Sequence, residues 1–182
     1  DYIGQEHLIG EGAILRKAIM ENNVPSMILW GPPGVGKTTL ANIIANTISA
    51  QFYTLSAINS GVKEVREVID RAKLNSGNSI LFVDEIHRFS KNQQDSLLGA
   101  VEQGIVRLIG ATTENPSFEI ISPLLSRAQV YVLKNLERHH LEKIIQRAVS
   151  YLEQEGNRKI EIQETEALLR MSGGDARNLI NA

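Results

Sequence analysis

The stretch SMILWGPPGVGKTTL, residues 26–40, decides the fold of this chain. A short apolar run at 26–30 leads straight into a segment rich in glycine and proline, which is followed by a run with helical spacing. An apolar run that ends at Gly-Pro-Pro is typical of a buried parallel strand. Residues 31–38 fit the pattern G-x-x-x-x-G-K-[ST], whose backbone N–H groups surround bound phosphates. The stretch therefore predicts a strand, a phosphate-binding loop and a helix in succession.

Each residue type in this loop has a physical reason to be there. Glycines let the backbone approach phosphates without a Cβ in the way, and the following helix presents its positive N-terminal end. Lys37 adds a charge near the β- and γ-phosphates, and the Thr38 hydroxyl can bind Mg²⁺. A glycine-rich turn that matches the pattern by chance is the alternative interpretation. We expect nucleotide binding by Gly31, Pro32, Pro33, Gly34, Val35, Gly36, Lys37, Thr38 and Thr39.

Strands and helices alternate on both sides of this loop. Further strands are expected at 52–55, 79–83, 105–112 and 129–133, and helices at 11–22, 38–49, 61–75 and 92–104. This alternation predicts an α/β fold with a five-stranded parallel sheet between helices. After residue 133 only helices are expected, at 137–156, 163–174 and 175–182, with Asp175 as the N-cap of the last. We therefore expect a P-loop core at 1–134 and a small, all-helical subdomain at 135–182.

Composition sets limits on the function. The chain has 182 residues, 42% of them hydrophobic, which suffices for one α/β domain with a sizeable core. Its net charge of -2 shows no global basic excess, so nucleic-acid binding would need a local patch. The absence of cysteine excludes a disulfide framework and a thiolate metal site. The chain opens without Met, and we interpret it as part of a longer protein, with no membrane role expected.

A pair of acids follows the expected strand at 79–83. In ILFVDEIH, residues 80–87, Asp84 and Glu85 stand where that strand ends. At the end of a strand in a P-loop sheet, Asp84 can hold Mg²⁺ through water, and Glu85 can polarise an attacking water molecule. Such a pair favours hydrolysis over transfer to a small acceptor. Two solvated acids that open a turn are the alternative interpretation.

Three more segments carry polar candidates. Thr112 and Thr113 end the expected strand at 105–112, where a hydroxyl can sense the γ-phosphate, although β-branched residues also simply suit a strand. Arg127 is expected on a short helix just before the fifth strand, either as a surface residue or as a finger that reaches the nucleotide of a neighbouring subunit. Arg177 is expected in the first turn of the last helix. It either lies over the γ-phosphate or is an ordinary solvated helix residue.

Taken together, GPPGVGKTT, ILFVDEIHRF, LIGATTENPSFEI, SPLLSR and GGDARNLINA resemble the AAA+ ATPases of the clamp-loader and branch-migration group. The joined segments IHRFSKNQQDSLLGAVEQG and LIGATTENPSFEIISPLLSR are most similar to the replication-associated recombination ATPases within that group. The resemblance covers the whole chain, as the ATPase core and the start of the lid of that family's longer architecture. It implies ATP and Mg²⁺ as cofactors, with Thr38 and Asp84 on the metal side.

The resemblance also implies a role for each matching residue. Segment 31–38 would be Walker A, and the acid pair would be Walker B with Glu85 as the general base. Thr113 would be sensor 1, Arg127 the arginine finger acting in trans, and Arg177 sensor 2. Tyr2 and Ile3 would lie nearest the adenine. One departure is visible, because the family usually continues the finger as Ser-Arg-Cys and this chain has Ala128, so any role of that cysteine is missing.

The implied activity is ATP hydrolysis coupled to DNA replication, recombination and repair at stalled forks or gaps. The resemblance implies DNA with a junction of single and double strands as partner, a homo-oligomer in the full-length protein, a bacterial cytoplasmic, nucleoid-associated location, and a single-stranded-DNA-binding protein as a further partner. We expect the isolated chain to be monomeric, to bind ATP and to hydrolyse it poorly. The candidate DNA contacts are four cations that equally suit solvated faces: Lys63, Arg66, Arg88 and Lys91.

Other functions remain open at this point. A clamp-loader subunit or a Holliday-junction branch-migration ATPase has the same fold, and a P-loop kinase for a small molecule or a non-hydrolysing ATP-dependent module is a more distant alternative. A kinase has no need of Glu85, Arg127 and Arg177 together. The four histidines, at 7, 87, 139 and 140, show no metal-ligand spacing, and we interpret them as structural or solvated.

Overall fold

The structure is a computed structural model that describes residues 2–58, 60–75, 78–156 and 159–181. Residues 1 and 182, the outer ends of the two expected domains, lie outside the described residues. The contacts within the chain define two compact units. The core unit consists of Glu6–Gly31 and Lys37–Leu133, and the helical unit consists of Asp1–Gln5, Pro32–Gly36 and Lys134–Ala182. Each unit is described by itself.

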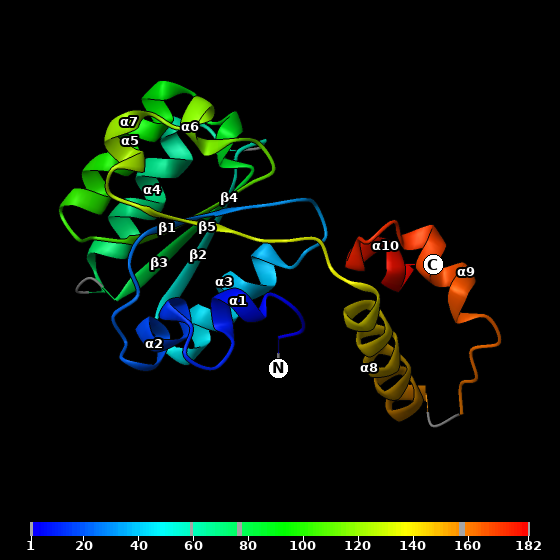
Figure 1. The fold of residues 1–182 in the computed structure, drawn as a ribbon. Helices are drawn as coiled ribbons and strands as arrows, with labels where there is room; N and C mark the ends of the chain where they lie inside the picture. The colour runs from blue at the N-terminus through cyan, green and yellow to red at the C-terminus, as the bar shows by residue number, and fades with distance from the viewer. Residues whose placement is uncertain (1, 59, 76–77, 157–158, 182) are drawn as a thin grey trace. The chain divides into compact units, whose positions relative to one another are not determined.

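The core unit is built on a five-stranded sheet, as predicted (Figure 1). Its strands are β1 Met27–Trp30, β2 Gln51–Ser56, β3 Ser79–Asp84, β4 Arg107–Thr112 and β5 Gln129–Val132. The strand order is β2-β3-β4-β1-β5, and every neighbouring pair is parallel. The carboxyl ends of β1, β3 and β4 therefore share one edge, because parallel strands run in the same direction.

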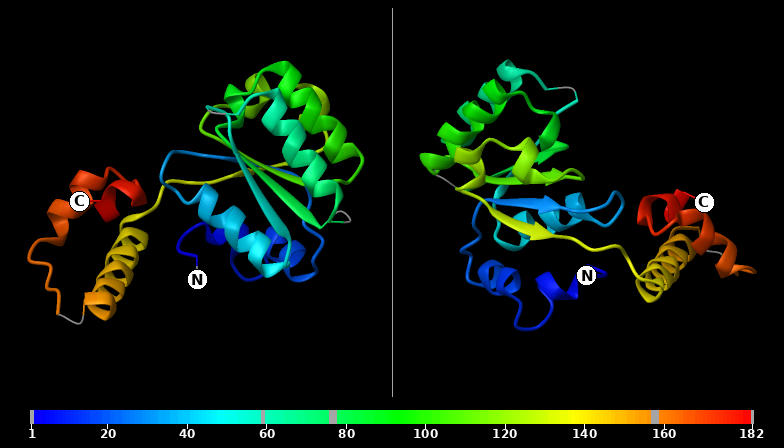
Figure 2. Two further views of the ribbon diagram at one scale, coloured as in Figure 1. Left: turned by 180° about the vertical axis from the view of Figure 1, so that it is seen from behind. Right: turned by 45° about the horizontal axis from the view of Figure 1, so that its top comes forward.

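Helices cover both faces of this sheet (Figure 2). α1 Glu6–Ile9, α2 Ile14–Met20 and α3 Lys37–Thr47 lie on one side, and α4 Val62–Lys73, α5 Lys91–Glu102, α6 Pro116–Glu119 and α7 Ser122–Leu125 lie on the other. The first five residues of β3 are all buried, because helices cover both of its faces, and this explains its unbroken apolar run. α1, α6 and the 3-10 turn η1 Ile86–Arg88 were not predicted.

One buried amide joins three segments beside the carboxyl ends of the strands. Gln94, on α5, is 2% exposed. Its Nε2 donates to the carbonyls of Phe89, at 3.0 Å, and Glu119, at 3.1 Å. Its Oε1 accepts from the backbone N–H of Ile121 at 2.9 Å. This side chain therefore satisfies one carbonyl that follows η1 and two backbone groups at the carboxyl end of α6.

β5 forms one edge of the sheet. Val130 and Val132 on this strand are 41% and 48% exposed. The Nε2 atom of His7, from α1, lies 2.9 Å from the carbonyl oxygen of Val132, so α1 covers part of the open edge. The described part of the chain thus leaves a short, partly covered strand edge with two apolar side chains at its surface.

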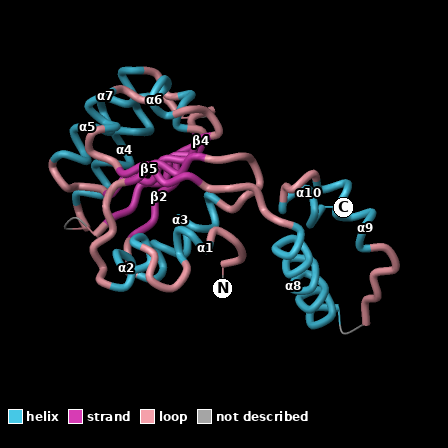
Figure 3. The backbone as a smooth tube through the Cα atoms, viewed as in Figure 1, coloured by secondary structure: helices cyan, strands magenta, loops and turns pink. Residues whose placement is uncertain are grey.

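The helical unit contains α8 Arg138–Gly156, α9 Thr165–Ser172 and α10 Ala176–Asn181, and Figure 3 shows helices and loops but no strand in its described residues. Its small core consists of Leu136, Leu141, Ile145 and Leu179. The predicted N-cap is confirmed, because Asp175 Oδ1 accepts from the backbone N–H groups of Arg177 at 2.7 Å and Asn178 at 3.2 Å. Whether 134/135 is a true domain boundary stays a prediction.

Candidate nucleotide-binding site

In the core unit, the phosphate motif begins at the end of β1 and resumes at the start of α3. The backbone N–H of Gly31 donates to the Thr112 carbonyl at 3.1 Å, which continues the pairing of β1 with β4. Lys37, the first residue of α3, is only 8% exposed, and its Nζ donates to the Gly31 carbonyl at 2.7 Å. A Cβ on Gly31 would lie 2.5 Å from the Leu133 carbonyl oxygen, so only glycine fits there. The hydrogen bond from Nζ to the Gly31 carbonyl therefore holds the Lys37 side chain against the first residue of the phosphate motif.

The middle of the motif belongs to the helical unit. Gly34 and Gly36 have φ angles of +69° and +94°, which a residue with a Cβ rarely adopts. The Tyr2 hydroxyl donates to the carbonyls of Val35, at 3.1 Å, and Gly36, at 3.2 Å. Burial raises the pKa of this hydroxyl above its ordinary value. Tyr2 therefore shares its one hydroxyl proton between two neighbouring loop carbonyls.

The acid pair stands at the carboxyl end of β3. Asp84 is the last residue of that strand and half-buried, and one of its carboxylate oxygens accepts the backbone N–H of Glu85 at 3.1 Å. Glu85 has φ +54° and ψ +43°, the left-handed conformation that a residue with a side chain adopts only at a cost. This conformation turns the chain sharply out of the strand into η1. Asp84 therefore has the extended backbone of a strand, whereas Glu85, the next residue, has a left-handed backbone.

The donor set fits Mg²⁺. The Thr38 side chain is exposed on the first turn of α3, and Asp84 ends a strand that shares its sheet edge with β1. A hydroxyl and a carboxylate are the hard oxygen ligands that Mg²⁺ prefers, with water or phosphate in the remaining positions. Thr38 and Asp84 would hold the ion, and this assignment stays a prediction.

The structure brings together two polar side chains that the sequence analysis treated separately: Thr112, a candidate sensor, and His87, interpreted as structural or solvated. Thr112 is fully buried at the end of β4, and its Oγ1 lies 2.9 Å from Nδ1 of His87. The Nε2 of His87 lies 3.3 Å from an oxygen of Glu85. Thr113, the expected sensor, is half-buried in the next position. The signal available in the sequence was the residue pattern DEIH, which places an imidazole two residues beyond the second acid.

The two arginine candidates occupy different units. Arg127 was expected on a helix, and this is wrong, because α7 ends at Leu125 and Arg127 lies in the turn that follows. Its guanidinium contacts Glu102 at 2.5 Å and the Pro123 carbonyl at 2.9 Å. Arg177 is exposed in the first turn of α10, as predicted. Their roles toward a nucleotide stay predictions.

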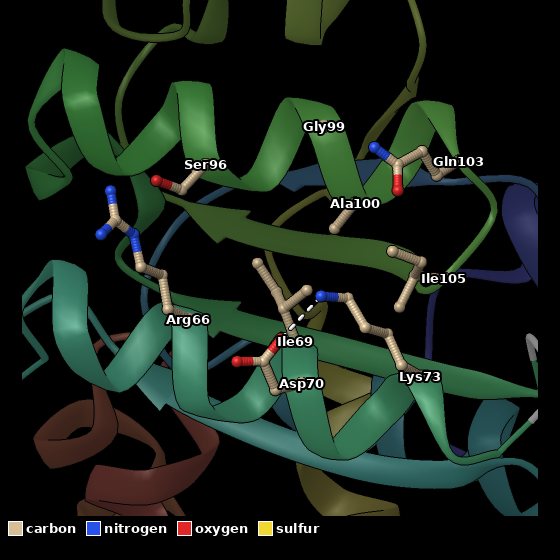
Figure 4. Close-up of a pocket in the computed structure, with 9 residues that line it drawn as sticks. All are labelled: Arg66, Ile69, Asp70, Lys73, Ser96, Gly99, Ala100, Gln103 and Ile105. Atoms are coloured by element: carbon tan, nitrogen blue, oxygen red, sulfur yellow. Dashed lines mark hydrogen bonds and ion pairs between the residues drawn. The ribbon is translucent and has the colours of Figure 1, made fainter.

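The candidate DNA contacts lie on exposed helical surfaces of the core unit. Lys63 makes an i,i+4 pair with Glu67 at 3.9 Å, and Arg88 approaches Glu85 at 3.8 Å. Lys91 begins α5 and is exposed. Arg66 faces an open groove of about 320 Å³ between α4 and α5 (Figure 4), whose other lining residues are Ile69, Asp70, Lys73, Ser96, Gly99, Ala100, Gln103 and Ile105. All four cations are exposed.

A parallel sheet in the order β2-β3-β4-β1-β5, with a lysine-bearing loop after β1 and two acids after β3, defines a P-loop ATPase fold. The sequence pattern of the ATPase family associated with various cellular activities (AAA) matches residues 27–136, and the chain belongs to this family. No helix in the described residues is long and apolar enough to cross a membrane.

Individual relatives narrow the comparison. The chain is 53% identical to Replication-associated recombination protein A of Haemophilus influenzae, over 99% of this chain and 42% of that protein. It is 48% identical to the protein of the same name from Escherichia coli K12, again over 99% of this chain and 42% of that protein. It is 47% identical to ATPase WRNIP1 of Dictyostelium discoideum, over 100% of this chain and 21% of that protein. The chain thus spans less than half the length of these relatives.

Solved structures agree on the fold. The Holliday junction branch migration motor RuvB of Thermotoga maritima superposes with a TM-score of 0.80 at 31% sequence identity. The match covers 98% of this chain and 60% of that one. The resemblance to the branch-migration group is therefore confirmed in sequence and in structure.

Proposed function

We propose that the chain is the nucleotide-hydrolysing part of a Mg²⁺-dependent AAA+ ATPase that acts on DNA in the maintenance of replication and recombination. The observation that carries the proposal is the shared sheet edge. Buried Lys37 at the start of α3 and the acids Asp84 and Glu85 after β3 all belong to the carboxyl ends of parallel strands. The relatives named for replication-associated recombination supply the biological setting.

The chain's own residues divide the work of hydrolysis. Lys37 and the loop N–H groups bind the phosphates, and Thr38 and Asp84 hold the metal side. Glu85 orients a water molecule and accepts its proton as that water attacks the γ-phosphorus, while the bond from the γ-phosphorus to the β–γ bridging oxygen breaks and ADP leaves. The chemistry that Mg²⁺ supplies when bound is neutralisation of charge on the phosphate oxygens. The Thr113 hydroxyl and Arg177 contact the γ-phosphate, and Tyr2 and Ile3 hold the adenine.

Arg127 acts on the nucleotide of a neighbouring subunit in this proposal. Its side chain is 43% exposed, and its partner Glu102 is 42% exposed. An exposed pair of this kind stabilises a fold by at most about 1 kcal/mol, so a nucleotide phosphate can compete for the arginine. A finger in trans requires a homo-oligomer, and we expect the isolated chain to bind ATP but to hydrolyse it slowly.

DNA is the partner in this proposal, and a single-stranded-DNA-binding protein is a second partner. The proposed location is the cytoplasm, in association with the nucleoid. Lys63, Arg66, Arg88 and Lys91 are its candidate contacts, and all are exposed. A Holliday-junction branch-migration ATPase is the second candidate function, because the superposition on RuvB has a TM-score of 0.80. The two differ in the DNA that stimulates turnover, a junction of single and double strands or a four-way junction.

The test is ATP hydrolysis by the full-length protein with and without each DNA, in wild type and Arg127→Ala. We expect junction DNA to stimulate turnover and the substitution to lower it by about 10³-fold or more without weakening ATP binding. Turnover that ignores DNA and tolerates the loss of Arg127 would refute the DNA function and the finger in trans. A burst of ADP that depends on an added small-molecule acceptor would instead reveal a kinase.

A further inference from the structure

We infer that His87 is a positioning residue, which links the Glu85 carboxylate to the buried Thr112 hydroxyl and so fixes the acid at the end of β3. Both ring nitrogens are engaged: Nδ1 lies 2.9 Å from Thr112 Oγ1, and Nε2 lies 3.3 Å from Glu85 Oε2. The His87 side chain is 12% exposed and that of Glu85 is 28% exposed. The contacts therefore lie largely out of water, where a hydrogen bond holds a group more firmly.

The position of the proton on the His87 ring follows from the chemistry of its two partners. An ionised carboxylate only accepts, so Nε2 of His87 must carry the proton that points at Glu85. In a neutral imidazole Nδ1 is then the acceptor, 2.9 Å from Thr112 Oγ1. The Glu114 carbonyl, 3.2 Å from the same hydroxyl, competes for its single proton, and the shorter contact favours Nδ1. The backbone N–H of Glu114 donates to the same hydroxyl oxygen at 3.0 Å. His87 thus joins the Thr112 hydroxyl, through a hydrogen bond, to the Glu85 carboxylate, through a polar contact of 3.3 Å.

Glu85 needs such support because its backbone gives it little. It stands in the left-handed region, outside the strand, at the entry to a single 3-10 turn. Apart from His87, the ion-pair partner of its carboxylate within the described residues is Arg88, whose Nε is 3.8 Å away and whose side chain is 59% exposed. A carboxylate held only by a long, exposed contact samples several rotamers. His87 therefore supplies the fixed contact.

Thr112 is well placed to anchor this chain. It pairs in register with Trp30 on β1, and its carbonyl accepts the N–H of Gly31 at 3.1 Å. One residue thus contacts the first glycine of the phosphate motif through its backbone and His87 through its side chain. The distance between the acid and the start of the phosphate loop is thereby fixed across β4, which lies between β3 and β1.

This inference rests on the proposed hydrolysis for its kinetic consequence, and two matched pairs of variants test it in the full-length protein. His87→Gln retains a donor near the Nε2 position, whereas His87→Asn retains polar atoms near Nδ1 and loses the contact with Glu85. Thr112→Ser retains the hydroxyl and Thr112→Val removes it. The exposed His139→Gln, in the helical unit, is the control.

We expect His87→Asn and Thr112→Val to lower kcat about 10- to 100-fold, as a misplaced general base does, with KM and Kd for ATP within about twofold of wild type. His87→Gln and Thr112→Ser should remain within about fivefold of wild-type kcat. Equal activity of the Asn and Gln variants would overturn the inference. So would a loss of ATP affinity that accompanies each loss of kcat, because that pattern indicates general damage to the site.

A second measurement does not depend on hydrolysis. The ¹⁵N resonances of the His87 ring, in labelled chain in mildly alkaline buffer, should show a proton on Nε2 and none on Nδ1. Thr112→Val should shift the Nδ1 resonance and Glu85→Gln the Nε2 resonance. A ring protonated on Nδ1 alone would refute the positioning contact. If the resonances agree but the wild-type protein does not hydrolyse ATP, the proposed function fails and the positioning contact of His87 stands.

Discussion

Replacing Glu85 by glycine should stabilise the core unit relative to replacement by alanine. Both changes remove the carboxylate and its contacts, so the difference between them isolates the backbone. At φ +54° and ψ +43° a residue with a Cβ is disfavoured by about 1–2 kcal/mol. The greater freedom of glycine in the unfolded chain offsets about 0.4–1 kcal/mol of this. We therefore expect Glu85→Gly to be more stable than Glu85→Ala by about 0.5–1 kcal/mol.

The assay is thermal and urea unfolding followed by the fluorescence of Trp30, the single tryptophan of the chain, which lies on β1 and reports on the core unit. The difference corresponds to a shift in Tm of about 1–4 °C for a domain of this size. The control is Asp95, exposed in the middle of α5, where glycine should be less stable than alanine by about 1 kcal/mol. A glycine variant at 85 that is less stable than the alanine variant would refute the left-handed assignment.

Three further predictions concern single side chains. Gln94→Leu should destabilise the core unit by about 2–4 kcal/mol in urea unfolding, because it leaves buried backbone groups without partners. The control Asn92→Leu, on the exposed side of α5, should change the free energy of unfolding by under about 0.5 kcal/mol. Equal effects of the two substitutions would contradict the role assigned to the Gln94 amide. Burial raises the pKa of Tyr2 above 10.0, so at high pH the folded state keeps a proton that the unfolded chain releases. The free energy of unfolding should therefore be unaffected below about pH 10 and fall above it. Unfolding followed by circular dichroism should show a smaller fall in Tyr2→Phe. Asp84→Asn should abolish the tightening of ATP binding by Mg²⁺ in calorimetric titrations, and an unchanged Mg²⁺ effect would exclude this residue from the metal side.

Much of the fold was predictable from the chain because its signals are local. The apolar run at 79–83 identifies one strand, and the glycine-rich loop at 31–36 marks the end of another. Both signals come from residues that are neighbours in the sequence. The five parallel strands agree with that expectation. The placement of β4 between β3 and β1 brings the acid pair and Thr112 to the same edge.

The finer parts of the site were not predictable for a physical reason. The left-handed backbone of Glu85 is a single-residue feature with no periodic signal, and the contacts of His87 depend on a residue 25 positions away. The end of α7 was also missed by two residues. Pro123 suits the start of that helix, but Arg127 is held by Glu102, which comes from α5 and is distant in sequence. Such contacts arise only once the sheet has formed.

The partly covered edge of the sheet has a practical meaning for handling the protein. β5 exposes a short row of backbone groups together with the side chains of Val130 and Val132. His7, on α1, contacts one of these groups, the carbonyl of Val132. Unpaired edges of this kind recruit strands from other molecules. Shortened versions that begin after residue 9 lack this cover. They should therefore precipitate or pair edge to edge at concentrations at which versions that retain α1 remain dispersed in light scattering.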